Sequence, residues 1–142
     1  MQALYIVYND SDNTNIPIID EQHRGIISII NTFFFHKADA KSDIDKFLVP
    51  SAEMLKHYAS LHFLTLERLM AESSYPYLEE EEERHKSMMK EIQNTDIKYR
   101  AARDADGFLN FLKKYWHKHA CKPDSGYIKH IKTYLCIKDG PC

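Results

Sequence analysis

Glycine and proline are scarce in this sequence, with four and five among its 142 residues. Folds made of many short strands need frequent tight turns, which these two residues supply, so their scarcity favours helices. An excess of charge of one sign is lacking too. The formal net charge is -2, and no basic cluster predicts a nucleic-acid or anionic-membrane partner. No apolar run approaches the roughly 20 residues of a membrane span, and no secretory leader pattern opens the chain, which leaves the cytoplasm as the expected location.

Cysteine is also sparse. Cys121, Cys136 and Cys142 make an odd number and lack the C-x-x-C spacing of many metal and redox sites. In a reducing cytoplasm they are expected to be free thiols, with a Cys121–Cys136 disulfide as the alternative. Histidine, by contrast, is abundant at eight residues, and its spacing carries most of the functional signal.

Helical periodicity runs through most of the chain after an irregular arm at residues 1–18. Apolar residues recur at three- and four-residue intervals in long segments that begin at about residue 20 and then cover about 42–73, 78–102 and 106–120. Pro50 should kink the second segment or mark where its regular part begins, and a short last helix is expected at about 127–135. Four long amphipathic segments with short connections predict an all-α fold, an antiparallel up-down four-helix bundle in a single domain spanning 1–142.

Each long segment carries a histidine among the apolar residues of its inner face, namely His23, His62, His85 and His119 in turn. A buried histidine costs free energy unless it is paired or metal-bound, so four at equivalent places need a common cause. Imidazole nitrogens and carboxylate oxygens suit iron or manganese, and helical bundles often hold two such ions. A hydrogen-bonded polar core is the alternative. The other histidines face elsewhere or sit near element ends and are expected to be non-ligands: His36, His57, His117 and His130.

Three short motifs occur in order at separations that suit a bundle. They are Asp20-Glu21-Gln22-His23, then Tyr58 four residues before His62-Phe63, then His119 five residues before Asp124. In order and spacing they resemble bacterial hemerythrins from about Tyr8 to Tyr127. The resemblance implies two iron ions joined by an oxo or hydroxo bridge, with manganese as the alternative metal. It also implies that the centre binds dioxygen, or another small diatomic or peroxide ligand, through five histidines and two bridging carboxylates.

Carried over position by position, the resemblance assigns metal ligation to His23, His62, His85, His119 and Asp124. Two positions depart from the family pattern. Leu66 stands four residues after His62, where the family has a bridging glutamate, and it should form an apolar wall of the metal pocket. Glu81 stands four residues before His85, where the family has another histidine. Glu81 shares the inner face with His85 and is the sixth expected ligand, with a solvated place in the acidic run 79–83 as the alternative.

Three further residues could contribute to the site. Glu67 is turned about 140° from His62 on a regular helix, so it is expected on the surface unless a π-bulge brings it round to replace the missing bridge. Tyr58 and Tyr115 each precede a predicted ligand by one turn. Both are expected to pack in the core, with a hydrogen bond to a ligand as the alternative. In the family, tryptophan is usual at the positions of Tyr8 and Tyr115.

These assignments predict a non-haem di-iron protein that binds dioxygen for storage, delivery or sensing. A carboxylate at Glu81 adds negative charge, which stabilises the oxidised metal and should disfavour reversible release of dioxygen. Two alternatives therefore stay open. One is a di-iron or dimanganese enzyme of the oxidase or peroxidase type. The other is a site that holds a single metal because Leu66 removes one bridge.

Overall fold

The computed structural model describes residues 4–37, 44–120 and 125–136. Its elements in chain order are the 3-10 turn η1 (Asp10–Asp12), α1 (Pro17–Lys37), α2 (Ile44–Glu72), α3 (Leu78–Ala102), α4 (Ala105–Tyr115), the π-helical segment η2 (Trp116–Ala120) and α5 (Gly126–Tyr134). The described part of the chain contains no strand, and none of its helices combines the length and apolar character that crossing a bilayer requires.

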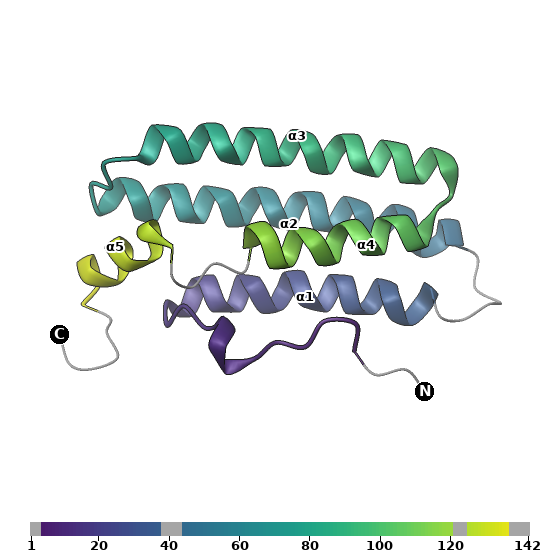
Figure 1. The fold of residues 1–142 in the computed structure, drawn as a ribbon, viewed down its shortest axis with the longest axis horizontal. Helices are drawn as coiled ribbons and strands as arrows, with labels where there is room; N and C mark the ends of the chain where they lie inside the picture. The colour runs from purple at the N-terminus through teal and green to yellow at the C-terminus, as the bar shows by residue number, and fades with distance from the viewer. Residues whose placement is uncertain (1–3, 38–43, 121–124, 137–142) are drawn as a thin grey trace.

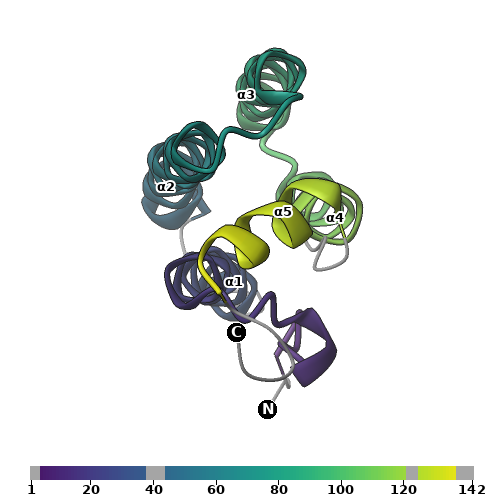
Figure 2. The same ribbon diagram turned by 90° about the vertical axis from the view of Figure 1, so that its left-hand side faces the viewer.

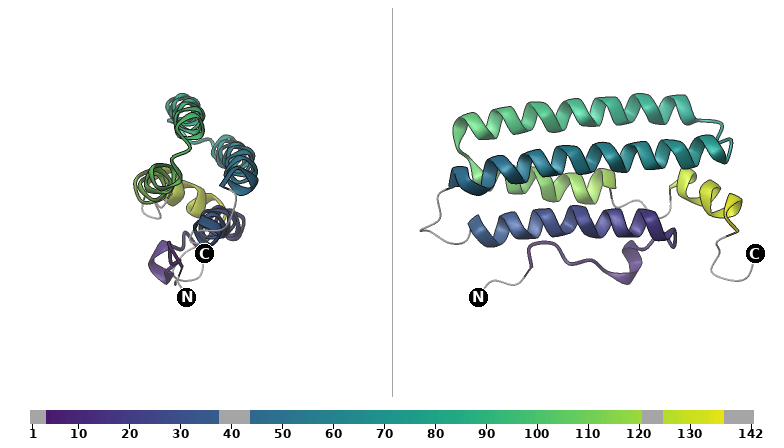
Figure 3. Two further views of the ribbon diagram at one scale, coloured as in Figure 1. Left: turned by 90° about the vertical axis from the view of Figure 1, so that its right-hand side faces the viewer. Right: turned by 180° about the vertical axis from the view of Figure 1, so that it is seen from behind.

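The helices α1 to α4 run alternately up and down and form an antiparallel bundle (Figure 1). Each packs on the next along the chain, and α4 closes the ring against α1, as the end-on view in Figure 2 shows. The short α5 lies across one end of the bundle and contacts α2. Figure 3 shows the same arrangement from the opposite end and from behind. The predicted all-α four-helix bundle with a short final helix is therefore confirmed.

Most helix bounds follow the predicted ones, with instructive differences. α3 covers Leu78–Ala102 as expected. α1 begins at Pro17, before the predicted start, because proline lacks the N–H that a first turn leaves unpaired and already has a helical φ. α2 runs unbroken through Pro50, so the alternative in which the regular helix begins at Pro50 is wrong. The fourth helix changes from α to π geometry at Trp116, which the apolar period did not predict.

The bundle interior has two apolar clusters, one larger than the other. The larger cluster contains Phe33 of α1, Leu55 of α2 and Phe108 of α4. The smaller one joins the start of α1 and the end of α2 to α5, and it contains Ile16, Ile19, Leu66, Met70, Tyr127, Ile128 and Ile131. The apolar face of α5 therefore closes the end of the bundle where α2 stops.

The N-terminal arm is held to the bundle by side chains of α1. Asp20 accepts hydrogen bonds from Thr14 through its backbone N (2.8 Å) and its hydroxyl (2.8 Å), and from the Asn15 N–H at 3.1 Å. Further along α1, Asn31 bonds the backbone N and O of Ile6, both at 2.8 Å. Asp20, the first residue of the Asp20-Glu21-Gln22-His23 motif, thus fixes the turn into α1.

Cys136 is disulfide-bonded. The expectation that all three cysteines are free thiols is therefore wrong at this position. Cys121 and Cys142 lie outside the described residues.

Candidate metal centre

The buried histidines lie at one level, between the two apolar clusters. Along α1, His23 separates Ile19 of the smaller cluster from Ile26 of the larger one. Along α2, His62 stands in the same way between Ala59 and Leu66. His85 on α3 lies ahead of Met88, and all three histidines are at most 4% exposed. A polar layer thus lies between the two apolar clusters, and it requires compensation because unpaired buried polar groups are costly.

Gln22 fixes the tautomer of His62. Thr65 donates its hydroxyl proton to the Leu61 carbonyl at 2.9 Å, so its oxygen can accept the bond from Gln22 Nε2 at 2.9 Å. The opposite end of the Gln22 amide is then an acceptor, Oε1, at 2.9 Å from His62 Nδ1. An acceptor at Nδ1 places the proton there, which leaves Nε2 of His62 with a free lone pair.

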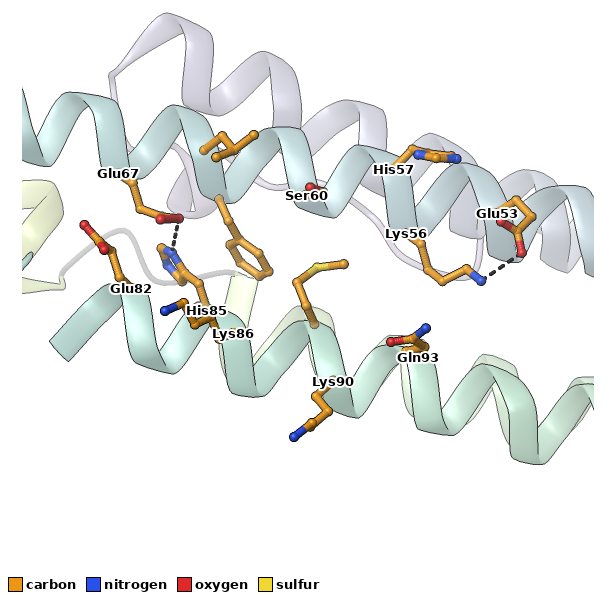
Figure 4. Close-up of a pocket in the computed structure, with 13 residues that line it drawn as sticks. Glu53, Lys56, His57, Ser60, Glu67, Glu82, His85, Lys86, Lys90 and Gln93 are labelled. Atoms are coloured by element: carbon orange, nitrogen blue, oxygen red, sulfur yellow. Dashed lines mark hydrogen bonds and ion pairs between the residues drawn. The ribbon is translucent and has the colours of Figure 1, made fainter. Parts of the chain in front are cut away.

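Glu67 of α2 fixes the tautomer of His85 on α3 in the same way. Its Oε2 lies 3.1 Å from His85 Nδ1, as Figure 4 shows. An ionised carboxylate only accepts hydrogen bonds, so Nδ1 of a neutral His85 carries the proton and Nε2 is available. The Phe63 ring stacks on His85 with centroids 4.3 Å apart and planes 14° apart. The expectation of a surface acid at Glu67 is wrong, since its side chain is 24% exposed and bonded to a buried histidine.

His23 is the third histidine of the layer, and its surroundings differ from those of the other two. Its ring centroid lies 4.8 Å from that of His62 and 5.3 Å from Trp116, whose ring meets it edge-on. Trp116 is 1% exposed and keeps water from that side. Nδ1 of His23 is buried and has no hydrogen-bond partner among the described residues. An orphaned buried nitrogen beside a second imidazole fits a missing cationic ligand such as a metal ion.

Both rings of this pair are neutral at pH 7. Burial lowers the pKa of His23 from 6.5 to about 4. Burial, with the neighbouring His23 and His85 adding to it, lowers the pKa of His62 to about 3. Metal ligation requires unprotonated imidazole, so the apolar surroundings that disfavour a proton keep these nitrogens ready for a metal ion.

Glu81 points inward more than most of its acidic neighbours. Its side chain is 16% exposed, whereas that of Glu83 is 73% exposed. Oε2 of Glu81 is buried, and it lies 3.0 Å from Arg84 Nη2 without the alignment of a hydrogen bond. Glu81 is therefore mostly buried and paired with Arg84, and its place as a sixth metal ligand stays a prediction.

The remaining predictions about individual residues have mixed outcomes. Leu66 is inward and 3% exposed as expected, and its neighbours belong to the cluster that includes α5. Tyr58 and Tyr115 pack in the larger cluster as predicted. The histidines expected to be non-ligands lie apart from the layer: His36, His57 and His117 are exposed, and His130 bonds the Ser73 carbonyl at 2.8 Å.

The structure brings together only some of the predicted ligands. His23 and His62 are adjacent, and His85 lies beyond Phe63. Within residues 4–37, 44–120 and 125–136, no three His, Cys, Asp or Glu side chains are grouped to hold one ion. Asp124 and the side chain of His119 lie outside the described residues.

Two residues that shape the site were not predicted from the sequence. Gln22 sets the His62 tautomer, and its place one residue before His23 was visible only as part of a motif. Trp116, rather than the preceding Tyr115, contacts His23. The period of an ideal α-helix does not predict this contact of Trp116, because the helix changes to π geometry at Trp116 itself.

Comparison with known proteins agrees with the motifs. No family model matches the sequence. A bacteriohemerythrin of Stenotrophomonas maltophilia is 26% identical over 132 residues, which cover 92% of this chain and 84% of that protein. A bacteriohemerythrin of Pseudomonas aeruginosa is 25% identical over 139 residues, 95% of this chain and 88% of that protein. In the order of its motifs and along nearly its whole length, the chain is thus similar to bacteriohemerythrins.

Proposed function

We propose that this protein binds dioxygen, for storage, delivery or sensing, at a non-haem di-iron centre in the histidine layer of a single hemerythrin-like domain. The observation that supports it most is the state of the imidazoles. His23 and His62 are adjacent, buried and neutral, and the Nδ1 proton of His62 is fixed by Gln22, so that Nε2 is free. The similarity to proteins named bacteriohemerythrin supports the choice of iron and dioxygen.

In this proposal His23 and His62 would hold one ion, and Glu81, His85 and His119 would hold the other. Asp124 would be a further ligand, as the resemblance of its motif implies. When bound, the two ferrous ions would supply the electrons that dioxygen binding requires, one from each. The protein's own residues orient the imidazoles through Gln22 and Glu67 and exclude water through Trp116. Leu66 leaves the first group with fewer donors, so the ion on His23 and His62 should be the more weakly held.

Metal stoichiometry followed by an optical titration tests the proposal. The protein purified anaerobically and loaded with Fe²⁺ should hold up to two irons per chain. It should develop a charge-transfer band with O₂ that reverses on purging with inert gas. One tightly held iron would indicate a single-metal site instead. Steady consumption of O₂ or peroxide would indicate an oxidase or peroxidase. Either result would contradict the proposed function.

The same measurement separates Glu81 from its neighbours in the acidic run. Glu81→Ala should lower the bound iron, because an inward carboxylate is lost, whereas Glu80→Ala removes an equal charge from an exposed side chain. Equal iron contents in the two variants would remove Glu81 from the ligand set.

A further inference from the structure

We propose that Glu67 is a positioning residue of the centre: its carboxylate holds the His85 ring in place and strengthens Nε2 as a donor to the metal. The proposal rests on the proposed function for its second half only, because the contact between Glu67 and His85 is made by the protein's own side chains. Glu67 itself would touch neither the metal nor dioxygen.

Two contacts fix the His85 ring, and both come from the same face of α2. Phe63 stacks on the ring at 4.3 Å, and Glu67, one turn further along, accepts its Nδ1 proton at 3.1 Å. A face contact alone would let the ring rotate in its plane, and an edge contact alone would let it tilt. Together they leave one orientation for Nε2. This is the usual arrangement in which a carboxylate orients a metal-binding histidine.

A groove between α2 and α3 keeps the Glu67 carboxylate partly hydrated. The groove has a volume of about 650 Å³, and both Glu67 and His85 line it, with Phe63 and Met89 supplying apolar parts. In Figure 4, Glu67 reaches down from α2 toward His85 on α3. The Glu67 side chain is 24% exposed against 5% for His85. Water can therefore stabilise the charge of Glu67, while its hydrogen bond is directed at the buried ring.

The helix geometry argues against Glu67 as a substitute bridge. A π-bulge after His62 would be needed to turn Glu67 toward the bundle axis, and α2 keeps α geometry from Ile44 to Glu72. The inward position is taken by Leu66, which is 3% exposed. Glu67 consequently acts on the centre through His85.

The charge of Glu67 should affect the metal as well as the ring. A hydrogen bond to a carboxylate draws the Nδ1 proton outward and makes Nε2 a stronger donor, which favours the oxidised metal. Glu67→Gln keeps an acceptor oxygen of nearly the same reach and removes the charge. Glu67→Ala removes both. The two variants separate the positioning effect from the electronic one.

The first measurement uses the metal-free protein. Nitrogen-15 NMR at about pH 8 should show His85 with its proton on Nδ1 in the wild type and in Glu67→Gln, and a shift toward the Nε2-protonated form in Glu67→Ala. Glu82→Gln is the matched control, since Glu82 lines the same groove without a hydrogen bond to His85. An unchanged His85 tautomer in Glu67→Ala would overturn the positioning role, whether or not the protein binds iron.

The second measurement uses the iron-loaded protein. Glu67→Gln should keep the wild-type iron content and raise the ratio of reduced to oxidised iron at a fixed potential about tenfold, or 59 mV for a one-electron couple. Glu82→Gln should shift it much less. Loss of an iron in Glu67→Gln would show that Glu67 is itself a ligand. Equal shifts of the ratio in Glu67→Gln and Glu82→Gln would show that Glu67 acts only through long-range charge. Either result overturns the proposal. A wild-type protein that binds no iron would contradict the proposed function. The His85 tautomer would still test whether Glu67 positions the ring.

Discussion

The two buried imidazoles of His23 and His62 predict an acid-labile apoprotein. Folding lowers both pKa values from 6.5, to about 4 and about 3, so the unfolded chain binds protons first as the pH falls. The stability gained by burying neutral rings is complete above about pH 6.5 and is lost toward the folded pKa values. At about 1.4 kcal/mol per unit, the metal-free protein should lose at least about 2 kcal/mol of unfolding free energy between pH 7 and pH 4.5, measured by urea denaturation.

The same titration on two variants tests whether these rings are responsible. His62→Gln removes one buried imidazole and should flatten the pH dependence markedly. His57→Gln removes an exposed imidazole from the same helix and should leave it as in the wild type. If both variants follow the wild-type curve, groups other than the histidine layer cause the acid sensitivity.

Leu66 tests the altered ligand set directly. Leu66→Glu restores a carboxylate one turn after His62, so it should raise the affinity for the second iron and strengthen the magnetic coupling between two irons. The metal-free variant should unfold more easily, because the new carboxylate is buried beside Met70 and Ile128. Iron titration with susceptibility measurements checks the first part and denaturation the second. Leu66→Met, which conserves volume, should change neither iron binding nor coupling. Equal iron affinities in Leu66→Glu and Leu66→Met would contradict the prediction.

Residues on the bundle axis were predictable from the sequence, and residues between two helices were not. His23, His62 and His85 follow the apolar period, and all three are buried. Glu67 was expected on the surface because it was compared with His62, from which it is turned by about 140°. Compared with Phe63, four residues earlier, it lies on the face that meets α3. The period of one helix identifies its most buried face but does not say which helix lies beside it.

At the level of elements, a charged network joins α2 to α3 away from the histidines. Asp96, with a side chain 3% exposed, lies 2.9 Å from Lys56 Nζ and 2.9 Å from Arg100 Nη2. Glu53 contacts the same two cations at 2.8 and 2.9 Å. Asp96→Asn leaves two cations with one carboxylate fewer and should lower the unfolding free energy by about 2–4 kcal/mol, measured by urea denaturation.

A surface pair on the same helix provides the control for this network. Glu83 and Lys86 are each 73% exposed, so Glu83→Gln should lower the unfolding free energy far less than Asp96→Asn does. Asp96 is eleven residues from His85, or about 16 Å along the helix, and its substitution should leave iron content unchanged. Similar stability losses in both variants would show that burial of Asp96 contributes little.

The helices themselves were largely predictable, and their irregular parts were not. α3 has its predicted bounds because Tyr75-Pro76 interrupts the chain just before it, while Arg103, in the left-handed region with φ 53°, ends it. The π geometry of η2 leaves no trace in an apolar pattern, because the extra residue in its turn shifts only the residues from Trp116 onward. The end of the fourth segment, where His119 occurs in the sequence, is thus the part that periodicity describes least well.

At the scale of the whole molecule, the histidine layer divides a larger apolar cluster from a smaller one. The larger cluster draws its residues from all four long helices, α1 to α4. The smaller one depends on α5 and on the two helix ends around Leu66. Metal bound between them would tie these parts together, since ligands on several helices must move in concert for the metal to leave.

Removal of metal should therefore loosen one end of the molecule more than the other. Hydrogen–deuterium exchange of the iron-loaded and chelator-treated proteins should show the larger increase in α5 and in the α2 segment around Met70. Little change is expected around Leu55, where the larger cluster is buried. Binding to the folded state alone stabilises it by RT ln(1 + [L]/Kd), so a uniform increase along the chain would indicate global stabilisation only. Preferential exchange at the α5 end would instead show that the layer couples the smaller cluster to the rest of the bundle.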